Sequence, residues 1–354
     1  MRELEVFFDI FYLTFAMYLG LKMFTSKKPG KNLLGTMAIL LAGGDTFHLV
    51  PRIISRVEEN GFVINKNLLL YGSKVSAITM SIFYVLFYIY IKKIVGYKNK
   101  KMDFALGLSL IVREILVIYN FVNLSDTLDL ISNIPFLVMG IIVICLLIKF
   151  KYKEELKNLW IWVFLSFAFY TPVVLFKRTY PMVGALMIPK TMAYIMMIVK
   201  FRKNTKESFG SLEFLRSAFS FLISGLIAGA FYREFGKIAP LAPNLLRVHG
   251  HLIVLGFIVL FVFFLALKNL QIQGQEFKTT LKIYEAGMFL TYSIMFLHGL
   301  INLYKPSKLL INSMTGFAGV GHILLGVSIV MIIFKLIKYF SKDQIKGQIL
   351  KGQI

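Results

Sequence analysis

The segment LISNIPFLVMGIIVICLLI (130–148) contains no charged side chain. A helix needs about 20 mostly apolar residues to cross the hydrocarbon core of a bilayer, which is roughly 30 Å thick. Within a bilayer core, a helix also satisfies its own backbone hydrogen bonds, which an open strand cannot do. The segment therefore predicts a transmembrane helix.

The same pattern recurs along the chain and predicts an all-α integral membrane protein with about eleven transmembrane helices. The other ten predicted spans are 4–23, 33–54, 68–91, 104–123, 157–176, 182–201, 213–231, 246–267, 281–303 and 311–334. Of the 354 residues, 57% are hydrophobic and 16% are charged. Soluble domains contain roughly 25% charged residues, so the composition excludes a soluble enzyme, a disordered chain and a fibrous protein.

The distribution of positive charge predicts the orientation of these spans. The net charge is +22, but the basic residues lie in short clusters between apolar segments and form no single stripe, which argues against a nucleic-acid partner. Of the 40 Lys and Arg residues, 26 fall in alternate loops that would all lie on one side of the membrane. Because cytoplasmic loops carry the excess of Lys and Arg, we expect a plasma-membrane protein with its N-terminus outside and its C-terminus in the cytoplasm.

A polar stretch, KFRKNTKESFGSLEFLR (200–216), separates the first seven predicted spans from the last four. We therefore expect two membrane domains joined by a short linker. The expected division is a seven-helix domain at 1–203, a cytoplasmic linker at 204–212, a four-helix domain at 213–340 and a basic cytoplasmic tail at 341–354.

Four of the five histidines lie in the last three predicted spans, and this concentration is the strongest chemical signal in the sequence. They are His249, His251, His298 and His322. Imidazoles that project from facing helices of a four-helix bundle can supply the axial ligands of haem b. The sequence thus predicts a haem site or another metal site in the four-helix domain, near the outer face of the membrane.

The spacing of His249 and His251 bears on this site. Residues two apart on a helix point roughly 200° apart, so the pair cannot easily ligate one iron. Either the two histidines face different sites, each completed by His298 or His322, or one binds haem and the other has a second role. The basic residues Arg233, Lys237 and Arg247, at the outer helix ends, could pair with haem propionates.

Two alternatives to haem remain for these histidines. They could be hydrogen-bonding residues that join membrane helices without a cofactor. They could also bind zinc or copper. The single cysteine, Cys145, lies within an apolar span, which excludes a disulfide within one chain and a cysteine-based metal cluster.

Four motifs in this domain resemble a known family. GAFYREFGK (229–237), HGHLIVLGF (249–257), YEAGMFLTYSIMFLHGL (284–300) and TGFAGVGHILLGV (315–327) are similar to the successive motifs of an uncharacterised four-helix bacterial membrane family. The resemblance covers about 213–335. It implies that five residues matter: Arg233, Glu234, His249, His251 and His322. The family has HTH where this chain has HGH, so Gly250 is a departure.

The HxH helix is also similar in kind to one in subunit I of the haem-copper oxidases. In that subunit the two histidines serve different haems, and the likeness is an analogy of motif only. No oxidase copper triad is evident in this sequence.

The seven-helix part carries a second set of polar residues within its predicted spans. They are Asp9, Asp45, His48, Arg52, Lys74, Arg113, Glu114, Lys190 and Tyr194. A charge at the centre of a bilayer costs about 2.5 to 3.5 kcal/mol, so we expect the acids Asp9, Asp45 and Glu114 to pair with the three lysine and arginine residues within spans. The set is either an ion-pair lattice that fixes helix packing or a site for a quinone, another small molecule or a proton.

These signals together predict a haem b-binding integral membrane protein that transfers electrons or senses a redox or gaseous ligand. A proton-coupled secondary transporter that uses the buried charges is the main alternative. A membrane hydrolase is a further alternative, because GGD (43–45) resembles a motif of the membrane lysoplasmalogenases. The sequence does not decide whether the protein is an enzyme, since no P-loop, GxGxxG, HExxH or GxSxG motif is present.

Overall fold

The computed structural model describes most of the chain, with short gaps. The described ranges are 2–57, 60–176, 179–205, 209–235, 243–272, 274–301 and 308–350. They form helices and connecting turns, and no β-strand occurs within these ranges. The chain divides into two compact units, Met1–Glu207 and Ser208–Ile354.

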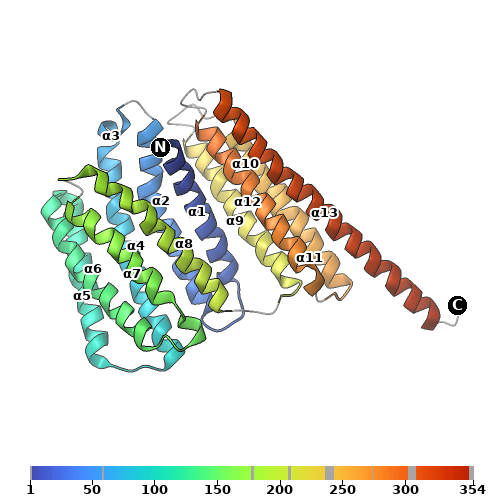
Figure 1. Cartoon of the computed structure of the whole chain (residues 1–354), viewed down its shortest axis with the longest axis horizontal. Coiled ribbons are helices and arrows are strands. Elements are labelled where there is room, and N and C mark those ends of the chain that lie inside the picture. Colours follow the sequence, from blue (N-terminus) through green and yellow to red (C-terminus); the bar gives the residue numbers. More distant parts are fainter. Residues whose placement is uncertain are drawn as a thin grey trace. The chain divides into compact units, whose positions relative to one another are not determined.

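The N-terminal unit is a bundle of long helices (Figure 1). The long helices are α1 (Arg2–Phe24), α2 (Lys31–Val57), α4 (Lys66–Val95), α5 (Lys100–Asn123), α6 (Asp126–Lys149), α7 (Leu159–Phe176) and α8 (Met187–Asn204). Three short helices connect them: α3 (Gly61–Ile64), η1 (Glu154–Leu156) and η2 (Pro181–Leu186). Helix α2 packs against α1 and α4, and α8 packs against α1, α2 and α7. Because α8 returns to the first two helices, polar residues distant in sequence meet in the centre of this bundle.

Local sequence explains several helix ends in this unit. Gly96 ends α4 with φ 66°, a conformation that glycine adopts without steric cost. The Asn99 side chain then caps α5 by accepting from the backbone N–H groups of Lys101 and Met102. Ser125 caps α6 in the same way.

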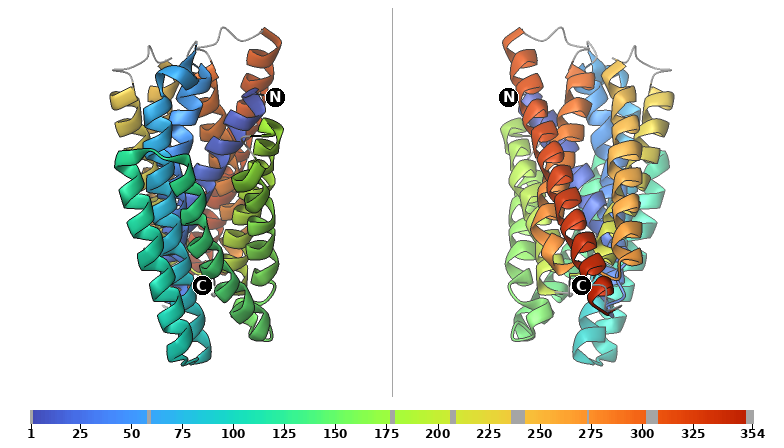
Figure 2. Two further views of the ribbon diagram at one scale, coloured as in Figure 1. Left: turned by 90° about the vertical axis from the view of Figure 1, so that its left-hand side faces the viewer. Right: turned by 90° about the vertical axis from the view of Figure 1, so that its right-hand side faces the viewer.

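The C-terminal unit contains four long helical segments. The first is α9 (Leu212–Phe235). The second is continuous and consists of α10 (Pro243–His251), η3 (Leu252–Val259) and α11 (Leu260–Asn269). The third and fourth are α12 (Lys278–Ile301), which a short η4 (Gln275–Phe277) precedes, and α13 (Lys308–Leu350). Segment η3 is a π-helix. The α10–α11 run packs on α9, and α13 packs on α12. Figure 2 shows from two sides that the long helices of each unit run side by side within that unit.

Helix α13 is longer than the sequence analysis predicts. It has 43 residues and continues beyond the other helices of its unit (Figure 1). Residues 341–350, expected as part of a separate basic tail, therefore extend the last helix.

Each predicted span coincides with a helix, and nine helices in the described ranges are long and apolar enough to cross a membrane. These nine are Lys31–Arg56, Lys66–Val95, Lys100–Asn123, Asp126–Lys149, Glu154–Phe176, Met182–Asn204, Leu212–Arg233, Leu245–Asn269 and Lys308–Ser341. Helices α1 and α12, predicted as the first and tenth spans, are not among them. The chain is thus a helical protein of the multi-pass membrane type.

Candidate functional site

Two of the four predicted histidine ligands meet in the C-terminal unit. His251, at the end of α10, and His322, on α13, place their Nε2 atoms 3.4 Å apart. The ring centroids are 5.5 Å apart and the rings are perpendicular, at 89°. Since the nitrogen atoms are closer together than the centroids, each ring points its Nε2 edge at the other.

Both rings are held by their other nitrogen atom. His251 Nδ1 lies 2.9 Å from the carbonyl oxygen of Arg247, and His322 Nδ1 lies 2.8 Å from that of Ala318. A carbonyl oxygen only accepts, so each Nδ1 carries the proton and donates. In the neutral rings both Nε2 atoms then carry a lone pair. Two facing lone pairs repel, so the pair suits one proton or one metal cation between the rings. Metal-ligating histidines are commonly oriented by such a bond from the second nitrogen.

The separation of the two Nε2 atoms can be compared with metal geometry. A single ion bonded to both nitrogens at about 2.0 to 2.1 Å would make an N–metal–N angle of roughly 110° at this separation. A haem iron would be held by the same two Nε2 atoms.

The histidine pair supplies two protein ligands. No group of three or more His, Cys, Asp or Glu side chains that could hold a metal occurs in the described part of the chain. A structural zinc site takes four protein ligands and a catalytic one takes three. Haem iron receives its four remaining ligands from the porphyrin, so two histidines complete its set.

A close crossing of two helices positions His322. A Cβ atom at Gly287 of α12 would lie 3.0 Å from the carbonyl oxygen of Gly321, and a Cβ atom at Gly321 would lie 2.9 Å from the backbone nitrogen of Thr291. Glycine on both sides lets α12 and α13 approach at this level. His322 is the residue that follows the crossing, so its place depends on that approach.

An irregular helical segment begins directly after His251. The eight residues of η3 form a π-helix, and the hydroxyl of Tyr284 on α12 donates to the carbonyl oxygen of Leu255 at 2.5 Å. π-Helical turns are rare and occur often at functional sites. The family motifs at 249–257 and 284–300 include part of this segment and Tyr284, but no pattern in the sequence predicted the π-helix or the hydrogen bond.

The other two histidines do not join the pair. His249 Nδ1 lies 2.7 Å from the carbonyl oxygen of Gly225 on α9, and a Cβ atom at Gly229 would lie 2.8 Å from the same nitrogen. His249 is therefore an interhelical hydrogen-bonding residue beside two glycines. His298 is half-buried on α12 and forms no group of three ligands with the pair.

The basic residues proposed for haem propionates are only partly described. Arg233 and Arg247 are exposed, and Arg247 lies one helical turn before His251. Lys237 and the side chain of Glu234 lie outside the described residues.

In the N-terminal unit, Asp45 is buried at the centre of a polar cluster. Tyr12 donates from α1 to Asp45 Oδ2 at 2.7 Å, and Ser76 donates from α4 to Oδ1 at 2.7 Å. Arg52, on the same helix as Asp45, pairs with Glu5 at 2.5 Å. Two hydroxyl groups thus satisfy the Asp45 carboxylate, and neither was predicted.

Lys190 and Arg113 are buried against aromatic rings. The Lys190 ammonium lies 4.8 Å from the ring centre of Tyr170 and 5.1 Å from that of Tyr194. The Arg113 guanidinium lies 4.0 Å above the Phe136 ring and donates to the carbonyl oxygen of Ser132 at 3.1 Å. Cation–π contacts of this kind are stronger where water is excluded.

No ion pair joins two of the six predicted charges in the described part of the chain, although the Asp45 carboxylate attracts the Lys190 ammonium. Lys74 pairs with Asp129, which also accepts from the Asn120 amide at 2.8 Å. Asp9 is buried, and neither its Oδ2 atom nor Oε1 of Glu114 has a hydrogen-bond partner in the described part of the chain. The physical reason is that Asp129 lies at the polar end of α6, within reach of Lys74, whereas aromatic rings surround the other two bases.

Comparison with known proteins adds one finding. Residues 212–339, within the C-terminal unit, match a family described as a protein of unknown function, DUF2871. This match agrees with the resemblance of the four motifs to an uncharacterised family. No curated protein and no solved structure matches the chain.

Proposed function

We propose that the C-terminal unit binds haem b through His251 and His322, and that the protein transfers electrons or senses a redox or gaseous ligand. The observation that carries the proposal is the pair of facing Nε2 atoms, each on a ring whose Nδ1–H is anchored to its own helix. Haem would supply reversible one-electron chemistry at this position.

The residues of this chain would have separate roles. His251 and His322 would hold the iron, while the glycine crossing of α12 and α13 fixes the position of His322. Arg247, exposed one turn before His251, is suited to pair with a propionate, and Arg233 is the second candidate. His249 would keep α9 and α10 together.

The setting in the membrane is also part of the proposal. Eleven spans with the N-terminus outside would place the His251–His322 pair between the outer face and the middle of the plasma membrane. The buried polar cluster of the N-terminal unit would then supply a site for a quinone, lipid or other small molecule.

The test is haem content in purified full-length protein. A reduced-minus-oxidised visible spectrum with pyridine haemochrome quantitation should give near one haem per chain. His251→Ala and His322→Ala should each lose at least about tenfold in bound haem, because one axial nitrogen is removed. The matched control His48→Ala, in the other unit, should retain it.

Equal haem content in all three variants would refute the assignment of the ligands. A colourless wild-type protein, with metal analysis also blank, would overturn the haem proposal. That outcome would favour a proton-coupled carrier that uses Asp45 and Lys190, or a membrane hydrolase, and uptake into vesicles would separate the last two.

A further inference from the structure

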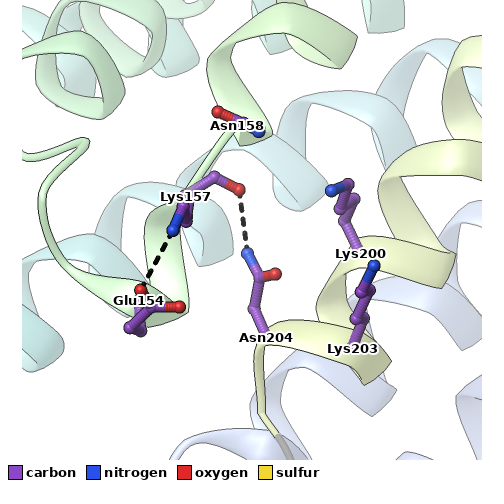
Figure 3. Close-up of a pocket in the computed structure, with 6 residues that line it drawn as sticks. All are labelled: Glu154, Lys157, Asn158, Lys200, Lys203 and Asn204. Atoms are coloured by element: carbon purple, nitrogen blue, oxygen red, sulfur yellow. Dashed lines mark hydrogen bonds and ion pairs between the residues drawn. The ribbon is translucent and has the colours of Figure 1, made fainter.

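A pocket of about 400 Å³ opens at one end of the N-terminal unit, where α7 begins and α8 ends (Figure 3). Its lining is entirely polar or charged and consists of Glu154, Lys157, Asn158, Lys200, Lys203 and Asn204. None of these residues belongs to the histidine pair or to the buried cluster around Asp45. The pocket therefore needs its own explanation.

Hydrogen bonds between distant parts of the chain form this pocket. The Asn204 amide at the end of α8 donates to the carbonyl oxygen of Lys157 at 2.9 Å and to that of Glu155 at 3.3 Å. Asn158 follows with φ 60°, a left-handed conformation that turns the chain into α7. The walls are thus held together by contacts of their own.

The charge inside the pocket is positive. Three lysines face one glutamate, and Glu154 is already paired with Lys157 at 3.2 Å. Lys200 and Lys203 have no ion-pair partner in the described part of the chain, and Lys200 is half-buried. Figure 3 shows the Lys200 side chain and the Asn158 amide on opposite sides of the same space. Two ammonium groups without a carboxylate favour an anionic ligand.

The neighbouring residues place the pocket at the level of lipid head groups. The protein has two tryptophans, Trp160 and Trp162, and both stand in the first turn of α7, two and four residues after the pocket residue Asn158. Tryptophan is enriched at membrane–water interfaces. Two of the membrane-length helices, Glu154–Phe176 and Met182–Asn204, also begin or end here.

We propose that this pocket binds a phosphate group, supplied by the head group of an anionic phospholipid. Lys200 and Lys203 neutralise the phosphate, and the Asn158 amide donates to its oxygens. Basic pockets between membrane helices on the cytoplasmic side are suited to such head groups. The proposal is independent of haem binding in the other unit.

The two tryptophans supply a local probe for the test. Detergent-solubilised full-length protein would be titrated with phosphatidylglycerol or phosphatidylcholine while tryptophan fluorescence is recorded. We expect a saturable change with phosphatidylglycerol only. The Lys200→Gln/Lys203→Gln variant should bind roughly 10- to 30-fold more weakly, since each lysine near a lipid head group contributes about a factor of five.

The matched control is Lys98→Gln/Lys101→Gln, which removes two exposed lysines outside the pocket. This variant should bind phosphatidylglycerol as the wild type does, and all variants should melt at the same temperature. A parallel titration with inorganic phosphate and pyrophosphate separates the sources of the phosphate group. Competition by these salts, lost in the Lys200/Lys203 variant, would support the phosphate site and assign it to a soluble ligand.

Two results would overturn the proposal. One is equal affinity of the pocket variant and the control variant for phosphatidylglycerol, which would show general charge attraction. The other is no fluorescence change with any lipid or phosphate salt, accompanied by no lipid adducts in native mass spectra of the wild type.

Discussion

His249 and His251 stand two residues apart, and their side chains bond in different directions. His249 reaches the Gly225 carbonyl oxygen on α9, and His251 faces His322 on α13. The 3.6-residue period predicts that they diverge. The period cannot predict which one meets another histidine, because that depends on how α10 is rotated against its neighbours.

At the same scale, the pair of Lys74 and Asp129 gives a prediction for stability. The Lys74 side chain is 2% exposed, whereas that of Asp129 is 40% exposed. Asp129→Asn leaves the buried Lys74 ammonium without its counter-charge. We expect this change to lower the free energy of unfolding by about 2 kcal/mol. The loss is smaller than for a fully buried ion pair because water screens Asp129. The measurement is thermal unfolding in detergent.

Two further variants test this pair. Thr127→Ala, at an exposed position in the same helical turn, should melt within about 1 °C of the wild type. The double variant Lys74→Met/Asp129→Leu removes both charges and should recover most of the loss. An unchanged melting temperature for Asp129→Asn would contradict the structural role of the pair.

The buried charges also show where residue-level prediction stops. Counting acids and bases within spans identifies Asp45, Lys74, Arg113 and Lys190 as residues that need partners. Their partners are largely neutral hydroxyls and aromatic rings, such as Tyr12 for Asp45 and Tyr170 for Lys190. The chain has 17 tyrosines, so the sequence position of one of them carries little information about which charge it contacts.

At the scale of elements, the crossing of α12 and α13 controls the histidine pair. Gly321→Ala would place a Cβ atom 2.9 Å from the Thr291 nitrogen, so the helices must separate. We expect a loss of about 1 to 3 kcal/mol in stability and a fall in haem content towards that of His322→Ala. Thermal unfolding and pyridine haemochrome assays measure the two effects.

The matched control for this crossing is Gly319→Ala, two residues earlier on α13. A Cβ atom there meets nothing within 4 Å. This variant should keep wild-type haem content and should be at least as stable, because alanine favours helix more than glycine does. If the two variants behaved alike, the crossing would not position His322.

Helix positions were predictable from the sequence, whereas helix irregularity was not. Apolar length locates each predicted helix, and all the predicted ends except that of α13 fall within a few residues of the observed ones. The π-helix at Leu252–Val259 lies in a uniformly apolar stretch, LIVLGFIV, that reads as ordinary α-helix. Its wider turn depends on tertiary contacts such as the bond from Tyr284, which appear only when α12 is in place.

At the scale of the whole molecule, the distribution of basic residues gives a prediction for topology. Alkaline phosphatase fused after Asn123 should be active because that turn is expected outside, and a fusion after Tyr97 should be inactive. Green fluorescent protein at the C-terminus should fluoresce. The opposite pattern of fusion activities would show that the orientation is reversed. The lysine pocket would then lie at the outer face of the membrane.

Whole-molecule organisation was only partly predictable. The polar stretch 200–216 indicates a break between seven helices and four, and the boundary between the compact units lies at 207–208. The sequence did not predict that α13 continues to Leu350. Its last turns are rich in Lys and Gln, which suit both a solvated tail and a helix, so composition alone does not distinguish them.

Helix α13 is long, and its close contact with α12 at Gly287 and Gly321 lies far from its C-terminal end. Leu350 lies about 43 Å along the helix from Gly321, at 1.5 Å per residue, whereas His322 lies next to this contact. If α13 tilts by about 5° at this crossing, Leu350 moves by roughly 4 Å, whereas the imidazole of His322 hardly moves. Small movements beside the histidine pair are amplified mechanically at the far end of α13.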